Sequence, residues 1–220
     1  MRKLTGAVFV SLDGVMQAPG GPEEDPTSDF RFGGWVAPFW DEQMGPFEKL
    51  IESDYDLLLG KRTYDIFSAY WPYNQDNPIG AKFERINKYV LTHSNDPLTW
   101  ANSEKLSGET ADAVASLKKT AGRDLLIQGS STVYVPLLAA GLIDQLVLIT
   151  FPIVLGKGKR IFDGSQKPGA LKLIDNYVSS TGVVTAIYEP AGDVPTGTFE
   201  TKEPSEAELK RREEWAREDA

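Results

Sequence analysis

Apolar segments that alternate between strand-like and helix-like patterns constrain the fold of this 220-residue chain more than any other feature. Short runs rich in leucine, isoleucine and valine are followed by longer segments whose apolar residues recur at helical spacing. In the first 140 residues the strand-like runs cover 7–12, 56–60, 89–92 and 125–127. Strands that alternate with helices are typical of a parallel sheet covered by those helices. We therefore predict an α/β fold with a mostly parallel central sheet and flanking helices.

The helix-like segments differ in how sharply the sequence bounds them. Residues 38–53 have helical spacing, but Gly45-Pro46 interrupts the pattern, so this helix is either broken or begins near Pro46. The other helix-like segments are continuous and cover residues 61–70, 79–87, 109–120 and 132–140.

Two long connections separate these elements. Residues 17–34 contain several glycines and prolines and the acidic run Glu23-Glu24-Asp25. A loop of this length inside a compact domain is usually functional or mobile. Residues 94–108 are polar, and in the predicted order of strands and helices they are only a connection.

The last third of the chain has a different pattern. Residues 145–151, 170–179 and 183–188 are strand-like with no helix between them, so we expect antiparallel strands that complete the sheet. Residues 206–218 are mostly charged and carry opposite charges at i,i+4 spacing, which favours a helix. We predict one domain over 1–190 and a charged tail over 191–220. The tail is either solvated or forms a docking helix anchored by Trp215.

Composition excludes several kinds of site. The chain has no cysteine, which excludes disulfides, thiolate nucleophiles and cysteine-based metal centres. His93 is its one histidine, so multi-histidine metal sites are excluded and we expect no bound metal. A formal net charge of −9 argues against binding to nucleic acid or to a membrane surface. No run of 18 apolar residues occurs, and Asp13-Gly14 cuts the first apolar run short, so we expect no signal peptide and a cytoplasmic protein.

Polar groups follow four predicted strands, at the ends where ligands bind in parallel α/β sheets. Two of these ends lead directly into helices, whose first N–H groups and dipoles attract anions. Gly129 would let a phosphate approach the backbone, and Lys61 or Arg62 would add charge. We therefore predict a site for a phosphate-rich cofactor, with plain turn geometry as the alternative at each strand end taken alone. The four ends are 11–14, 60–63, 92–94 and 128–132.

Six short motifs, taken in order, resemble the dihydrofolate reductase-like superfamily, and most of all its bacterial branch related to the reductase domain of riboflavin biosynthesis. Their order and spacing match from about residue 2 to residue 189. The motifs are SLDG at 11–14, GGW at 33–35, LLGKRTY at 58–64, YVLT at 89–92, QGS at 128–130 and GLID at 141–144. The resemblance implies a sheet flanked by helices that binds NADPH.

The resemblance also implies where NADPH would lie. Its adenosine and pyrophosphate end would be held by Gly60, Lys61, Arg62 and Thr63. Its 2′-phosphate would lie beside Thr92, His93 and Ser94, and its pyrophosphate would be cradled by Gly129, Ser130 and Ser131. The nicotinamide would lie near Ser11, Leu12 and Asp13.

On the substrate side, dihydrofolate reductases use a carboxylate of the first helix to recognise the pterin and assist its protonation. Asp41 or Glu42 falls in that region, although both could be solvated charges at a helix start. We predict that Asp41 faces the substrate, whereas Asp13 mainly shapes the cofactor loop through its turn with Gly14. A flat substrate would be walled by Trp35, Trp40, Phe47 and Trp71, unless these aromatic residues belong to the core.

The function implied by this resemblance is the NADPH-dependent reduction of a small flat heterocycle, pterin- or pyrimidine-like. Hydride transfer needs little acid–base machinery, because the cofactor carries the chemistry. One alternative is the riboflavin-pathway reduction of a ribosylamino-pyrimidine phosphate, for which Lys157 or Lys159 could hold the phosphate. Another is a nucleotide-binding protein without catalysis. Relatives in this branch are often dimers, so a homodimer is compatible with the resemblance.

Overall fold

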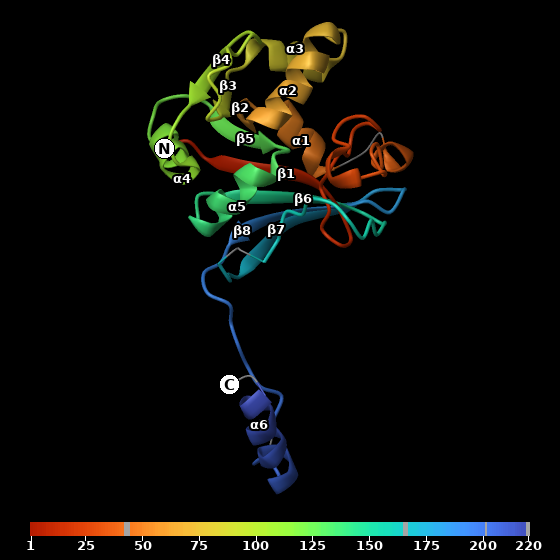
Figure 1. Ribbon diagram of the computed structural model, residues 1–220, viewed down its shortest axis with the longest axis vertical. Helices are drawn as coiled ribbons and strands as arrows, with labels where there is room; N and C mark the ends of the chain where they lie inside the picture. The colour runs from red at the N-terminus through yellow and green to blue at the C-terminus, as the bar shows by residue number, and fades with distance from the viewer. Residues whose placement is uncertain (42–44, 165–166, 201, 219–220) are drawn as a thin grey trace.

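An eight-stranded sheet crosses the centre of the described molecule (Figure 1). The structure is a computed structural model and describes residues 1–41, 45–164, 167–200 and 202–218. The strands lie in the order β4-β3-β2-β5-β1-β6-β8-β7. Their bounds are Leu4–Ser11 (β1), Tyr55–Gly60 (β2), Lys88–Leu91 (β3), Ser103–Leu106 (β4), Asp124–Gln128 (β5), Gln145–Phe151 (β6), Leu171–Val178 (β7) and Val184–Pro190 (β8).

Parallel pairing runs from β4 through to β6, which confirms the predicted mostly parallel sheet. Only β8 and β7 are antiparallel to their neighbours within the described residues. The prediction that 145–151 is antiparallel was therefore wrong, since β6 runs parallel to β1. The physical reason is the helix α5 (Ser131–Ala139), which carries the chain back across the sheet before β6 begins.

Strand β4 lies inside the stretch that the sequence presented as a polar connection. It is short, and it pairs in parallel with β3 at the edge of the sheet. Its sequence, Ser-Glu-Lys-Leu, has little apolar character because an edge strand is only partly covered. Apolar patterning was therefore a poor guide to this element.

Helices cover both faces of the sheet. The helices α1 (Pro46–Glu52), α2 (Lys61–Tyr70) and α3 (Pro78–Arg85) contribute buried residues to one core cluster, and α4 (Thr110–Lys118) and α5 to a second. In β2, Leu57 and Leu59 belong to the first cluster and Leu58 to the second, as the alternation of a strand requires. Short 3-10 turns cover Thr27–Asp29, Ala37–Phe39 and Trp71–Tyr73.

Helix α1 begins at Pro46, which confirms one of the two predicted alternatives. The missing N–H of a proline costs least at this first helical position. None of the helices in the described part of the chain is long and apolar enough to cross a membrane.

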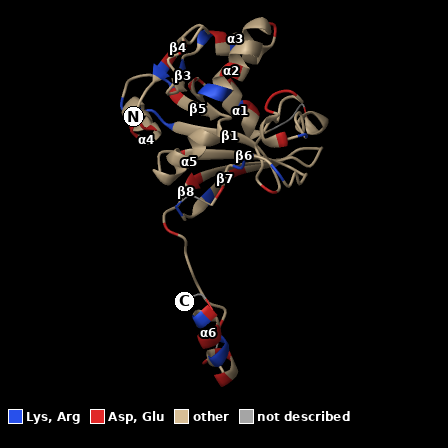
Figure 2. Cartoon of the chain, viewed as in Figure 1, with Lys and Arg blue, Asp and Glu red and all other residues tan. Residues whose placement is uncertain are grey.

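The charged tail ends in the helix α6 (Glu206–Glu218), which stands apart from the sheet in Figure 1. Both signs of charge follow one another along this helix (Figure 2). Arg212 pairs with Glu208 at 2.9 Å and also with Glu200, so these ion pairs stay within the tail. The side chain of Trp215 is 59% exposed. The predicted boundary at 190/191 is not sharp, because Ala191 and Gly192 exchange backbone hydrogen bonds with Ala170 at 2.8 Å. We therefore propose that the tail of 191–220 becomes a unit separate from the domain only after Gly192.

Deletion of residues 195–220 should leave the melting temperature nearly unchanged. Exposed ion pairs within a helix contribute only about 0–1 kcal/mol each, and none of those given above joins the tail to the sheet. Thermal denaturation of the truncated and full chains, followed by circular dichroism, would test this. A fall of several degrees would mean that Trp215 docks on the domain or on a second copy.

Candidate functional site

A cavity of about 610 Å³ opens at the carboxyl ends of the parallel strands. This volume is in the range of small-molecule and cofactor sites. One side, which we call the apolar wall, is formed by Val8, Phe9, Val36, Trp40, Phe47, Ile66, Phe67, Trp71, Ile79 and Ile149. The other part, which we call the polar end, is formed by Asp25, Arg62, Thr63, Lys159 and residues 128–132.

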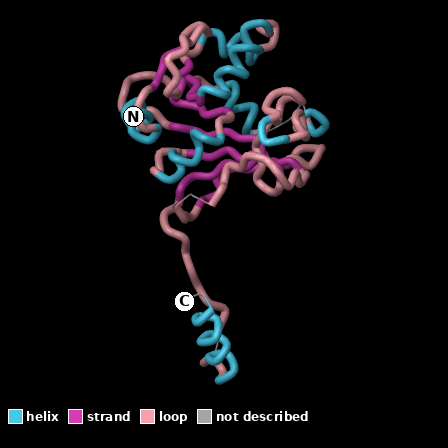
Figure 3. The backbone as a smooth tube through the Cα atoms, in the orientation of Figure 1, coloured by secondary structure: helices cyan, strands magenta, loops and turns pink. Residues whose placement is uncertain are grey.

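Two loops far apart in sequence meet beside this cavity. The loops after β1 and β6 lie at the same end of the sheet (Figure 3). Val15 forms an isolated bridge with Arg160, and the Met16 N–H donates to the Lys159 carbonyl at 2.8 Å. This pairing brings Lys159 to the polar end.

Asp13 holds these two loops together. Its carboxylate accepts from the Ser11 hydroxyl at 2.6 Å and from the N–H groups of Leu155 and Gly156 at 3.0 and 2.9 Å. The Arg160 guanidinium donates to the same carboxylate at 3.0 Å. The Ser11 hydroxyl, together with the two N–H groups, holds the pKa of Asp13 well below its usual range against the effect of burial. The ionised carboxylate of Asp13 therefore holds the loop in place.

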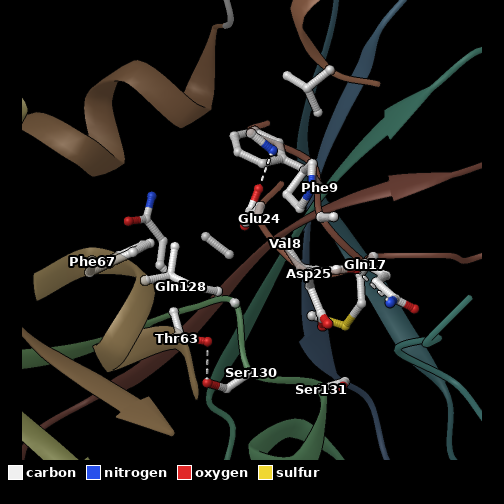
Figure 4. A pocket seen from close by; sticks show the side chains of 18 of the residues that line it. Val8, Phe9, Gln17, Glu24, Asp25, Thr63, Phe67, Gln128, Ser130 and Ser131 are labelled. Carbon is white, nitrogen blue, oxygen red and sulfur yellow. Dashed lines mark hydrogen bonds between the residues drawn. The ribbon is translucent and has the colours of Figure 1, made fainter. Parts of the chain in front are cut away.

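The turn from β5 to α5 forms the centre of the polar end. Gly129 and Ser130 both have left-handed backbone angles, with φ of +77° and +62°. The Ser130 hydroxyl lies 2.6 Å from that of Thr63 and accepts from the Gly60 N–H at 2.9 Å (Figure 4). A Cβ on Gly60 would lie only 2.7 Å from this hydroxyl, so glycine permits the close approach. The first turn of α5 is thereby fixed against α2.

Two cations at the polar end share one carboxylate. Arg62 donates to Asp25 at 3.3 Å, and the Lys159 ammonium also pairs with it. The Thr27 hydroxyl donates to the same carboxylate at 2.5 Å. Burial alone would raise the pKa of Asp25, but the hydrogen bonds from Lys159 and Thr27 outweigh it and lower that pKa. The cluster of Asp25, Arg62 and Lys159 therefore carries a surplus positive charge that could meet an anion.

Glu24 is the second carboxylate in the cavity wall. Its Oε2 accepts from the Gly20 N–H at 2.5 Å and from the Gly21 N–H at 3.2 Å. Burial raises the pKa of Glu24 by more than these two hydrogen bonds lower it, and the neighbouring charge of Asp25 raises it further. Adjacent residues thus place one carboxyl with a lowered pKa and one with a raised pKa at the same cavity.

Aromatic rings give the apolar wall its shape. Phe9 of β1 meets Phe47 of α1 edge-on, with ring centroids 5.3 Å apart, and Trp40 at 6.2 Å. Trp71 packs edge-on against Phe67 at 6.2 Å. Because these rings are fixed by one another, the wall could receive the faces or edges of a flat ring system.

Several of the residues predicted for the site line this cavity. For the cofactor these include Arg62, Thr63, Gly129, Ser130 and Ser131, and for the substrate Trp40, Phe47 and Trp71. Gly60 touches the site through Ser130. Their assignment to cofactor or substrate stays a prediction.

Other predicted residues make contacts away from the cavity lining. Lys61 donates to Asp65 at 2.7 and 2.9 Å on its own helix. Trp35 is buried and donates to the Gln17 carbonyl at 2.8 Å, with its ring edge-on to Phe151. Trp35 is thus a core residue, the alternative that its sequence left open.

The turn after β3 is closed on itself. The Thr92 hydroxyl accepts from the Ser94 N–H at 3.0 Å, and Ser94 donates to Asp96 at 2.6 Å. Lys105 of β4 donates to the Ser94 carbonyl at 2.6 Å, which adds a cation that the sequence did not reveal. His93 is exposed on this turn.

The predicted substrate carboxylate does not point into the cavity. Asp41 accepts from the Ser180 N–H at 3.0 Å and from the Ser180 hydroxyl at 2.6 Å, in the turn between β7 and β8. Asp41 is absent from the described residues that line the cavity. The second candidate, Glu42, lies outside the described residues. At the other catalytic candidate, Asp13, the carboxylate is engaged with the loop, and the neighbouring Leu12 is exposed.

Sequence reasoning missed Glu24 and Asp25 as cavity residues. Their acidic run was visible within the long loop, but nothing local indicates which way a loop side chain points. Lys159 was considered only for a substrate phosphate, and the structure places it next to Asp25. The pair of Asp25 and Lys159 could not be predicted because the two residues are far apart in the sequence and meet through the neighbouring strands β1 and β6.

Comparisons with known proteins add to this geometry. Residues 2–185 match the family model of the RibD C-terminal domain. The uncharacterized protein YyaP of Bacillus subtilis (strain 168) is 25% identical over 191 residues, which cover 85% of this chain and 94% of YyaP.

Two solved structures show the same fold. A Shewanella sp. PV-4 protein named for riboflavin biosynthesis matches with a TM-score of 0.65 and 20% identity, over 86% of this chain and 99% of its own. The dihydrofolate reductase of Enterococcus faecalis, complexed with NADP(H), matches with a TM-score of 0.52 and 17% identity, over 86% and 96%. At these identities the likeness concerns the fold, which is dihydrofolate reductase-like as predicted.

Proposed function

Because the chain belongs to the RibD C-terminal domain family, we propose that it is a reductase that uses NADPH to reduce a small flat heterocycle of the pterin or pyrimidine class. The observation that carries this proposal is that one cavity joins an apolar aromatic wall to a cationic polar end. Such a cavity suits one ligand with a phosphate-rich part and a second ligand that is flat and uncharged on its faces.

The polar end fits the phosphates of a dinucleotide. Gly129 leaves the backbone N–H groups at the start of α5 open to an anion, and Ser131 and Thr132 add hydroxyls there. Arg62 and Lys159 supply charge-assisted donors. When bound, NADPH would supply the hydride. The two solved structures support the same idea, since one is complexed with NADP(H) and the other is named for riboflavin biosynthesis.

Calorimetric titration with NADPH and NADH is the first test, and we expect NADPH to bind more tightly. Arg62→Ala should lower NADPH affinity about 10- to 100-fold, since a hydrogen bond to a charged group contributes about 1.5–3 kcal/mol. Lys61→Ala, on the same helix, should cost less because Lys61 is outside the described cavity lining, to which Arg62 belongs. Equal loss from both variants would contradict this ranking, and no binding of either nucleotide would overturn the proposed function.

Oxidation of NADPH in the presence of pterins, pyrimidines and flavins would then identify the substrate class. Lys159 at the cavity favours a second candidate, the reduction of a ribosylamino-pyrimidine phosphate, because its ammonium could hold the substrate phosphate. Matched pyrimidine substrates with and without the phosphate would separate the two. Binding of NADPH without turnover of any of these compounds would favour a nucleotide-binding protein without catalysis.

A further inference from the structure

We propose that Glu24 is the catalytic acid of this site and delivers the proton that accompanies hydride transfer. This assignment rests on the proposed reductase function. It replaces the expectation that a carboxylate near the first helix, Asp41, would have this role.

The loop that carries Glu24 holds the carboxyl group in place. Both hydrogen bonds from Gly20 and Gly21 go to Oε2, which leaves Oε1 available on the same carboxyl group. A Cβ on Gly33 would lie 2.6 Å from the Gly21 carbonyl, so the chain at Gly33 packs directly on this loop. The Gly34 N–H donates to the Ala18 carbonyl at 2.9 Å and closes the contact. These contacts therefore fix the turn that places Glu24 in the cavity wall.

The surroundings of Glu24 are those that a proton donor needs. Glu24 and Phe9 of the apolar wall line the same cavity, and Figure 4 draws them in one part of the view, away from the Thr63–Ser130 pair at the polar end. A flat ring against the apolar wall would therefore lie near the Glu24 carboxyl. Burial raises the pKa of Glu24, so its protonated form persists to higher pH than that of an ordinary glutamate.

The other ionisable groups in the described cavity lining are less suited to this role. They are Asp25, Arg62 and Lys159. Asp25 faces both cations, and its pKa is lowered, so it stays ionised and has no proton to give. Arg62 and Lys159 are both engaged with Asp25. When the surroundings of two neighbouring carboxyls push their pKa values apart, the one with the higher pKa can act as the acid and the other stays ionised.

The chemical step balances without a further reactant. The hydride from the reduced nicotinamide adds to the carbon of a ring C=N bond, and the π electron pair moves to the nitrogen. That nitrogen takes the proton from the Glu24 carboxyl, which becomes a carboxylate. Glu24 then takes up a proton from the solution after product leaves, so each turnover consumes one proton from the solvent. The substrate gains one C–H and one N–H bond, and NADPH becomes NADP⁺.

Glu24→Gln tests this role with little change of shape, because the amide oxygen can still accept from Gly20 and Gly21. The matched control is Glu23→Gln, which removes the same charge from the exposed neighbouring residue. NADPH affinity is measured for both variants by calorimetry, and turnover across pH with the best substrate from the panel. We expect Glu24→Gln to keep its NADPH affinity and lose about 10²-fold or more in kcat, as removal of a general acid does.

The pH dependence gives the sharper readout. Turnover by the wild-type chain should fall as pH rises through the raised pKa of Glu24, because only the protonated carboxyl donates. This fall in turnover with rising pH, the pH limb, should persist in Glu23→Gln and vanish in Glu24→Gln. A readout without turnover is ¹³C NMR of glutamate carboxyls, in which one resonance should titrate above the usual glutamate range in the wild type and be missing in Glu24→Gln.

The outcomes separate this assignment from the function on which it rests. If the wild-type chain neither binds NADPH nor reduces any compound of the panel, the proposed function fails and the assignment fails with it. If the wild type is active and Glu24→Gln retains both its kcat and its pH limb, the reductase stands and Glu24 is not its acid. Absence of an upward-shifted glutamate resonance would also overturn the assignment.

Discussion

Asp56→Ala should lower the free energy of unfolding by about 3–5 kcal/mol, because it leaves a buried guanidinium without its counter-ion. Arg2 and Asp56 are 3% and 1% exposed, and the guanidinium donates to the carboxylate at 2.6 Å. The same carboxylate accepts from the Asn87 N–H at 3.2 Å and lies 3.3 Å from Arg123. This cluster ties β2 to the amino-terminal end of the chain.

Asp54→Ala is the matched control for this loss. Asp54 pairs with Arg123 at 2.7 Å, but its side chain is 78% exposed, so its removal should cost about 0–1 kcal/mol. Urea denaturation of both variants gives the comparison. A double variant, Arg2→Met with Asp56→Leu, should recover most of the stability, because the penalty comes from the unpaired charge. Equal costs for Asp54→Ala and Asp56→Ala would mean that burial of the pair has no energetic consequence.

The same experiment separates stability from function. Asp56 belongs to β2 and lies outside the described lining of the cavity, which opens at the carboxyl ends of the strands. Once folded, Asp56→Ala should therefore bind NADPH as tightly as the wild type. A loss of affinity in the folded variant would show that the ion pair also positions the site.

The parts of the fold that could be predicted from the sequence are those with local causes. Leu57, Leu58 and Leu59 are fully buried because both faces of a central parallel strand are covered, and this produces a continuous apolar run. Strand β4 has no such run because it lies at an edge. The direction of β6 depends on how α5 packs, which its own residues do not encode.

The site residues differ in the same way: those with a local cause could be predicted, and those brought together by distant segments could not. The β5–α5 turn could be predicted because a glycine between a strand and a helix has a local meaning. Glu24, Asp25 and Lys159 could not, because their meeting depends on the contact of two loops 134 positions apart at Asp25 and Lys159. Asp41 was placed by analogy with a first helix, whereas the helix here begins only at Pro46. The carboxylate then lies before the helix and bonds to Ser180.

Gly129→Val should reduce NADPH affinity by more than 100-fold, the largest effect on cofactor binding that we expect from one substitution. The backbone at Gly129 has φ of +77°, and an added Cβ would lie 3.1 and 3.2 Å from Cγ2 and Oγ1 of Thr63. A branched side chain would therefore strain the turn and occupy the space through which a phosphate approaches the N–H groups of α5.

Strain alone would also destabilise the fold, so the loss of affinity needs a control with the same backbone conformation. Gly141 has φ of +63° at the other end of α5, and an added Cβ there meets no described atom within 4 Å. Gly141→Val should lose stability of the same order, about 1–3 kcal/mol, because both sites force a side chain into a left-handed conformation. It should nevertheless keep its NADPH affinity.

Calorimetry on both folded variants, with thermal denaturation as the check on folding, separates the two effects. Normal NADPH binding by folded Gly129→Val would remove this turn from the cofactor site, and an equal loss of affinity in Gly141→Val would assign the effect to the helix as a whole.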